Sequence, residues 1–279
     1  MMQTTYLGSD QLKRDFLGQI ALHEEQDALI KGTYGEMDGL QFKGCAIGCS
    51  LHSLNVLQGK ACPHERTGDH ARYQDELGLP VWLAHLEDNI FESLPDALSR
   101  TWPRRFAEAI PVGAVVDDRV FARILHWSLA SEAFGVRHVT EDVEIRGHVD
   151  VIATMIDAEA NGTVTADQRE AAARAAWDAR AAWDARAARA ARAAWAAWAA
   201  WDARDARAAW AARAAWDARD ARAAWAARAA WAAWAAWDAW AAWDAAQPSA
   251  TEKKAPAYYP ALSEFVLDVL RSLPVKAVV

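Results

Sequence analysis

The sequence predicts an all-α protein: a small helical globular domain, one very long helix built from an Ala/Trp/Arg repeat, and a short C-terminal amphipathic helix. Three observations lead to this prediction. Residues 1–162 show no sustained alternation of apolar and polar side chains, the pattern of half-buried strands. Every third residue over 174–245 is Trp or Arg, and the residues between them are Ala or Asp. Just before this repeat, Thr165 and Gln168 form a capping box, after which neither Gly nor Pro occurs before Pro248.

Shifts in composition divide the chain into four segments. We expect a mostly helical N-terminal domain over 1–162, a helical rod over 163–246, a linker over 247–260 and an amphipathic helix over 261–279. The last segment carries its apolar residues on one stripe, so it needs an apolar partner. That partner is either the N-terminal domain or another subunit.

The net charge of −8 is unevenly distributed. The repeat holds 11 Arg and 8 Asp and so carries +3, which leaves −11 on the rest of the chain. Nucleic-acid affinity depends on neutralising phosphates with Lys and Arg, so the acidic domain argues against a nucleic-acid partner. The Asp residues of the repeat also argue against a rod that binds nucleic acid or membrane through its Trp and Arg.

The cysteines and the N-terminal stretch indicate the cellular compartment of the protein. Cys45, Cys49 and Cys62 are too few, and odd in number, for a disulfide framework, which favours a reducing environment. The N-terminal MMQTTYLGSDQLKRDF lacks the apolar core of a signal peptide, and no apolar run of about 18 residues occurs. We therefore expect a cytoplasmic protein with no membrane partner.

The N-terminal domain is expected to begin with a helix over 9–31, because apolar residues recur at helical spacing up to Gly32, a stop signal. Four glycines within 32–44 indicate a loop or hairpin. The small residues of 45–57 predict a helix, and 59–67 a loop.

Proline marks the start of the next helix. Pro80 suits the first turn of a helix over VWLAHLEDNIFESL. Further helices are expected at 96–109, 117–133 and 140–158. Within the first of these, Trp102 is expected in the core, with the neighbouring arginines facing solvent.

The three-residue period of the repeat matches neither a straight α-helix nor a strand. Three residues turn an α-helix by about 300°, so the Trp and Arg positions pass round all its sides. In a 3₁₀-helix, residues i and i+3 eclipse and would form one ladder. Helix propensity favours the α-helix, because Ala and Arg are good helix formers and long 3₁₀ runs have poor hydrogen-bond geometry. The 3₁₀-helix, over part or all of the repeat, is the alternative.

The Trp side chains give the repeat a large apolar surface. Large exposed apolar patches mark interaction surfaces, so we expect the rod to self-associate into a homo-oligomer or to wrap on its own domain. The segment 199–213 recurs letter for letter as 214–228, which leaves the alternative that the period records slippage in a repetitive gene. The predicted interaction surface comprises Trp177, Trp183, Trp195, Trp198, Trp201, Trp210, Trp216, Trp225, Trp231, Trp234, Trp237, Trp240 and Trp243.

The stretch GCAIGCSLHS holds the strongest local candidate for a site. On a helix, Cys45, Cys49 and His52 share one face, and His23 lies on the first predicted helix. Because thiolate and imidazole ligands suit zinc, His23, Cys45, Cys49 and His52 are candidate metal ligands. The alternative is that the small residues and thiols allow close helix packing, with no cofactor.

Two other candidate chemistries have less support. His23 and Cys49 would be the base and nucleophile of a thiol hydrolase, yet no Asn or Asp has a spacing that ties it to them. The carboxylate pairs at 87–88 and 117–118 are typical of solvated helix faces or N-caps.

Three stretches of the N-terminal domain resemble a group of uncharacterised bacterial and phage-encoded proteins, which pair such a domain with an Ala-rich, often triplet-repeated tail. They are HEEQDALIKGTYGEMDGLQFKGCAIGCSLHS, ELGLPVWLAHLEDNIFESLP and WPRRFAEAIP. The resemblance covers roughly residues 10 to 115 and implies no activity. It implies that the positions to test are His23, Gly44, Cys45, Gly48, Cys49, His52 and 86–88.

The sequence therefore favours a non-enzymatic interaction or assembly protein whose Trp/Arg repeat mediates self-association or spacing. The alternative is a metal-binding protein or enzyme with its Cys/His site in the N-terminal domain and zinc as cofactor.

Overall fold

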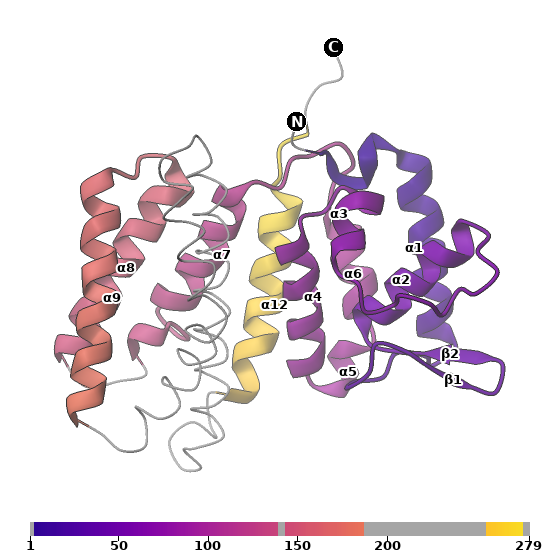
Figure 1. The fold of residues 1–279 in the computed structure, drawn as a ribbon, viewed down its shortest axis with the longest axis horizontal. Coiled ribbons are helices and arrows are strands. Elements are labelled where there is room, and N and C mark those ends of the chain that lie inside the picture. Colours follow the sequence, from indigo (N-terminus) through magenta and orange to yellow (C-terminus); the bar gives the residue numbers. More distant parts are fainter. Residues whose placement is uncertain (1–2, 139–142, 187–254, 276–279) are drawn as a thin grey trace. The chain divides into compact units, whose positions relative to one another are not determined.

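The structure is a computed structural model that describes residues 3–138, 143–186 and 255–275 (Figure 1). Of the described residues, 66% are helical and 5% lie in strands, which confirms a mostly helical protein. Within this described part, no helix is long and apolar enough to cross a membrane. The chain forms two compact units: unit 1 comprises 1–116 and 256–279, and unit 2 comprises 117–255.

Unit 1 contains short helices and one β-hairpin. In chain order its elements are η1 (Thr5–Gly8, a 3₁₀-helix), α1 (Asp10–Glu25), β1 (Glu36–Asp38), β2 (Gln41–Lys43), α2 (Ala46–Leu57), α3 (Ala71–Leu77), α4 (Val81–Ser93), α5 (Asp96–Ser99), α6 (Trp102–Ala109) and α12 (Ala255–Arg271). Helix α1 packs on α2 and α6, and α2 also packs on α4. The two strands pair antiparallel, with Met37 opposite Phe42, which confirms the hairpin expected from the glycines.

Large aromatic side chains fill the core of unit 1. Trp102, Tyr6, Tyr73 and Phe91 are all at most 1% exposed. The indole Nε1 of Trp102 donates to the backbone oxygen of Glu87 at 3.0 Å, so its polar atom is also satisfied. The predicted core position of Trp102 is confirmed.

The first helix is shorter than predicted, because α1 ends at Glu25 and not at residue 31. Asp27 takes a left-handed conformation with φ of 53°, which turns the chain out of the helix. The amide of Ile30 then donates to the oxygen of Gly44 at 2.9 Å, and the amide of Gly44 donates to Ala28 at 3.0 Å. The apolar residue Leu29 is therefore buried in an extended segment, bridged to Gly44, and not on a helical stripe.

One further predicted helix differs in its bounds, and one helix of unit 1 was not predicted. The segment 96–109 divides into α5 and α6, with Pro103 in the first turn of α6. Proline has no amide hydrogen to donate, so one continuous helix through this point would lose a hydrogen bond. Helix α3 was not predicted, and it ends at Leu77, before the C-cap Gly78, whose φ of 66° is left-handed.

The C-terminal helix packs on the N-terminal part of unit 1. Arg105 of α6 forms an ion pair with Glu264 at 2.7 Å, and Ala114 forms an antiparallel bridge with Val275. Leu262 and Leu270 are fully buried. The N-terminal domain is therefore the apolar partner that the amphipathic pattern required. Helix α12 also begins at Ala255, so the end of the predicted linker is helical.

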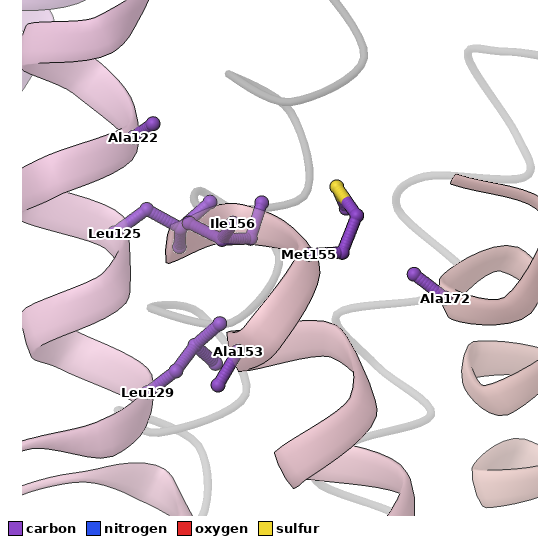
Figure 2. Close-up of a cluster of buried hydrophobic side chains, with 7 residues drawn as sticks. All are labelled: Ala122, Leu125, Leu129, Ala153, Met155, Ile156 and Ala172. Atoms are coloured by element: carbon purple, nitrogen blue, oxygen red, sulfur yellow. The ribbon is translucent and has the colours of Figure 1, made fainter. Parts of the chain in front are cut away.

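Unit 2 contains helices that follow one another along the chain. Its described elements are α7 (Asp118–Ala130), η2 (Val136–His138, a 3₁₀-helix), α8 (Val143–Asn161) and α9 (Ala166–Arg186). Figure 2 shows Leu125 and Leu129 of α7 pointing toward Ile156 and Ala153 of α8. Met155, also on α8, and Ala172 of α9 complete this buried cluster.

The predicted domain boundary at residue 162 differs from the observed division at 116/117. The reason is that α8 buries apolar residues against both α7 and α9. The start of the predicted rod therefore belongs to a folded helical unit.

The capping box that begins α9 is confirmed in both directions. The amide of Gln168 donates to the hydroxyl of Thr165 at 3.2 Å, and the amide of Thr165 donates to Oε1 of Gln168 at 2.8 Å. The first residues of the repeat, 174–186, continue α9 as an α-helix. Residues 187–254 lie outside the described part, so the choice between α- and 3₁₀-helix there stays a prediction.

Candidate functional site

The four predicted metal ligands of unit 1 do not form one cluster. Cys45 is the N-cap of α2, and its Sγ accepts from the amide of Gly48 at 3.5 Å. Cys49 is buried one turn later, where its thiol donates to the oxygens of Gly44 at 3.4 Å and Ala28 at 3.6 Å. Burial raises the pKa of Cys49 to about 12, so this thiol stays protonated. Cys49 therefore has the environment of a packing residue.

His23 and His52 do come together, as the sequence predicted. Nδ1 of His52 lies 3.2 Å from Nε2 of His23, and the ring of Phe42 stacks on His52 with centroids 4.2 Å apart. Burial, and then the neighbouring His52, lower the pKa of His23 to about 4. Because Cys49 donates to carbonyl oxygens while His23 faces His52, the proposed nucleophile–base pair does not form.

Cys45 belongs to a different cluster, which it forms with two carboxylates of α4. The candidate ligand atoms of Cys45, Asp88 and Glu92 all lie within 4.8 Å of one another. Among the described residues, this is the group of three or more His, Cys, Asp or Glu side chains whose ligand atoms lie that close together. The four ligands predicted from the sequence therefore do not share one centre, and the structure corrects that set.

Three aromatic rings, those of His70, His85 and Tyr34, lie beside this carboxylate cluster. Nε2 of His70 lies 3.4 Å from Oδ2 of Asp88, and the ring of His85 stacks on His70 with centroids 4.0 Å apart. The ring of Tyr34 meets His70 edge-on at 5.5 Å. Burial raises the pKa of Tyr34, and the nearby charge of Asp88 raises it further. Imidazole, phenol, thiol and carboxyl groups thus converge around Asp88.

Close backbone packing fixes Tyr34 in this place. A Cβ at Gly48 would lie 2.0 Å from the backbone oxygen of Tyr34, and one at Gly68 would lie 3.1 Å from its ring. The amide of Cys45 donates to the oxygen of Thr33 at 2.8 Å. The glycines of GCAIGCS therefore let the 33–35 loop lie directly on the start of α2, which confirms the close packing expected there.

A third carboxyl group, that of Glu87, lies next to Asp88 in sequence but faces the core. Glu87 is 1% exposed, and its Oε2 accepts from the hydroxyl of Tyr73 at 2.7 Å. Burial raises the pKa of Glu87 to about 8. The expectation that residues 87–88 form a solvated face is wrong, because α4 turns both toward the interior. At the other predicted pair, Asp117 is confirmed as the N-cap of α7.

The electrostatics of Cys45 limit what the cluster can do chemically. Burial, and then the charge of Asp88, raise the pKa of the Cys45 thiol far above its ordinary range. A nucleophilic cysteine needs a lowered pKa, usually from an adjacent imidazole or other cationic group. Here Asp88 lies between Cys45 and His70, so the arrangement suits cation binding better than thiolate catalysis.

The resemblance pointed to Asp88 only as part of the stretch 86–88, and neither Glu92 nor His70 was predicted as a member of a site. A signal for two of them was present: in HLEDNIFE, His85, Asp88 and Glu92 are spaced i, i+3 and i+7, which places them on one face of a helix. No comparable signal marks His70, whose position depends on the loop before α3.

Two residues of the predicted Trp surface, Trp177 and Trp183, belong to helix α9. The other eleven Trp residues lie outside the described part of the chain.

Comparison with protein families, with curated proteins and with solved structures finds no match to this chain.

Proposed function

We propose that this is an interaction protein that self-associates through its Trp/Arg/Ala repeat. The observation that carries the proposal is the density of Trp over 174–245, where 13 of 24 triplets begin with Trp. Burying such side chains stabilises an assembly by about 25 cal/mol per Å² of apolar surface removed from water. A helix whose Trp point to all sides has no single face for one intramolecular partner, which favours several neighbouring copies.

The anchoring of the repeat at both ends supports this role. At its start, the backbone of α9 runs from the packed helices of unit 2 into residues 174–186. At its far end, the chain enters α12, which packs in unit 1. Along the chain, the repeat therefore lies between the packed helices α7, α8 and α9 of unit 2 and helix α12 of unit 1.

The experiment is light scattering of the full chain across a concentration series. We expect a mass of at least a dimer that rises with concentration, and Trp emission shifted to the blue of water-exposed Trp. The matched control keeps the length, Arg and Asp of the repeat and replaces the eleven Trp of 187–245 by Ala. It should remain monomeric while both units stay folded.

A full chain that is monomeric at high micromolar concentration, with water-like Trp emission, would contradict the proposal. Equal association by the full chain and the Trp-to-Ala control would also contradict it, because the contact would then lie outside the Trp surface.

A further inference from the structure

The carboxylates of Asp88 and Glu92 on α4 form an acidic cluster, and within the described part of the chain His70 is the basic side chain at ion-pair distance from it. Asp88 and Glu92 lie one turn apart and face the thiol of Cys45. In the part of the chain that the structure describes, no Lys or Arg makes an ion pair with either carboxylate. Oδ1 of Asp88 is buried without a hydrogen-bond partner. Buried carboxylates are ordinarily paired with a cation or coordinate a metal ion.

A buried histidine points into the same cluster. His70 is 8% exposed, and its Nδ1 lies 3.1 Å from the backbone oxygen of Gly68. A carbonyl oxygen only accepts, so Nδ1 carries the hydrogen and Nε2 of the neutral ring keeps its lone pair. Nε2 has no hydrogen-bond partner and lies 3.4 Å from Oδ2 of Asp88. In the neutral ring two acceptors therefore face each other, and in the protonated ring the contact is an ion pair.

This arrangement is the one that metal-binding histidines use. A ligating imidazole commonly donates its other ring hydrogen to a backbone carbonyl, which fixes the tautomer and aims the free nitrogen at the ion. A cation between Nε2 of His70 and Asp88 would turn the contact between two acceptors into two ligand bonds. An ion that the carboxylate binds through both oxygens would also satisfy the unpartnered Oδ1 of Asp88.

We propose that unit 1 binds one divalent transition-metal ion through Cys45, Asp88, Glu92 and His70. The site goes beyond the self-association proposed above and uses no residue of the repeat.

The donor set selects the class of metal. One sulfur, one imidazole nitrogen and two carboxylate oxygens suit Zn²⁺ and similar ions, whereas Ca²⁺ and Mg²⁺ prefer oxygen ligands alone. Zinc holds sulfur at about 2.3 Å and oxygen at about 2.0 Å. The candidate ligand atoms of Cys45, Asp88 and Glu92 lie within 4.8 Å of one another, whereas Nε2 of His70 lies outside that group, 3.4 Å from Oδ2 of Asp88. Closing all four ligands on one ion therefore requires side-chain rotations that bring His70 nearer to the other two ligands. Binding requires the thiolate, so the Cys45 proton is released as the metal binds.

The experiment titrates the full-length chain with Co²⁺ and Zn²⁺ in a Cys62→Ser background, which removes the exposed thiol outside the cluster. We expect one equivalent of Co²⁺ to produce a thiolate-to-cobalt charge-transfer band in the near ultraviolet, and Zn²⁺ to displace it. Cys45→Ser should abolish the band, and it keeps a good N-cap for α2. Asp88→Asn and His70→Gln should retain the band and weaken Zn²⁺ binding by about tenfold or more.

Matched controls come from the residues that the sequence had suggested. Cys49→Ser and His52→Gln alter a buried thiol and a partly buried imidazole outside the cluster, and both should leave the band and the Zn²⁺ affinity unchanged. Absence of stoichiometric binding, a band that survives Cys45→Ser, or a band lost in Cys49→Ser would each overturn the site. Unchanged Zn²⁺ affinity in His70→Gln would overturn the role of His70 and leave its contact with Asp88 as an ion pair. Light scattering of the same samples reports self-association separately, so each proposal fails or stands independently.

Discussion

Unit 1 is closed by segments from distant parts of the chain, whereas the described part of unit 2 is built from helices that contact their chain neighbours. In unit 1, the amide of Thr5 donates to the oxygen of Ala114 at 2.9 Å, and Arg105 pairs with Glu264. In unit 2, α8 packs on α7 and on α9. The first unit therefore depends on long-range contacts and the second on local ones.

The two units also differ in what they bury. Of the buried polar and charged residues in the described ranges, Ser128 alone belongs to unit 2, and its hydroxyl donates within its own helix. Those of unit 1 include His23, His70 and Glu87, which contact other buried polar groups. Groups capable of binding or proton chemistry thus gather in unit 1, while unit 2 holds the start of the repeat.

Removal of α12 should have the largest effect. It buries five side chains almost completely, and each contributes about 1.5 to 3 kcal/mol, which together approaches the total stability of a domain. Truncation before Ala255 should therefore unfold unit 1, seen as loss of its near-ultraviolet circular dichroism. Deletion of 187–245, which keeps α12, is the control and should leave that signal intact. A native spectrum in the truncated chain would show that unit 1 does not need its long-range closure.

A cavity in the aromatic core should come next. Trp102→Ala removes a side chain that is 0% exposed and one indole hydrogen bond, so we expect a loss of about 3 to 5 kcal/mol in the free energy of unfolding. Met155→Ala in the cluster of unit 2 is the comparison and should cost about 2 to 3 kcal/mol. Chemical denaturation measures both. An equal or larger cost at Met155 would remove the distinction between the two cores.

Two glycines within helices, one in each unit, test the difference in packing between the units. Gly48→Ala would force its new methyl group onto the backbone of Tyr34, so we expect a loss of about 2 kcal/mol. Gly147→Ala in α8 meets no atom within 4 Å and should gain about 0.5 to 1 kcal/mol from helix propensity. Thermal unfolding compares the two variants. Stabilisation by Gly48→Ala would mean that the 33–35 loop does not lie on α2.

The buried His23 should make unit 1 sensitive to acid. Its pKa in the fold is about 4, below the ordinary value of 6.5, so the unfolded chain binds more protons between these values and stability falls as the pH drops through that window. The loss should reach about 2 kcal/mol at about pH 5. His23→Gln should remove this part of the pH dependence in denaturation curves recorded at about pH 7 and about pH 5. A variant with the slope of the parent would show that His23 is not held neutral.

The cap of α9 should have the smallest effect. Thr165→Ala leaves the amide of Gln168 without its hydroxyl acceptor, so the unfolding free energy of unit 2 should fall by about 1 kcal/mol. Thr165→Ser keeps the hydroxyl and should be nearly neutral. Hydrogen exchange in the first turn of α9 checks both variants, and equal protection in the two would contradict the capping role.

The sequence by itself determined the features that depend on a few neighbouring residues. The glycine-rich hairpin, the capping box of α9 and the helix after Pro80 were predicted because caps, turns and propensities act within one or two turns of chain. The amphipathic stripe of the last helix likewise predicted that this helix packs on an apolar partner.

Only the tertiary structure decided which residues meet. Leu29 continues a helical pattern, yet its segment takes its hydrogen bonds from Gly44 and becomes extended. Glu87 has the local signature of a solvated residue, yet α4 turns it into the core against Tyr73. The thiol of Cys45 belongs with Asp88 and not with the neighbouring Cys49, because the packing of α2 on α4 sets that contact. Such pairings depend on burial between segments far apart in sequence, and hydrophobic burial carries no directional signal along the chain.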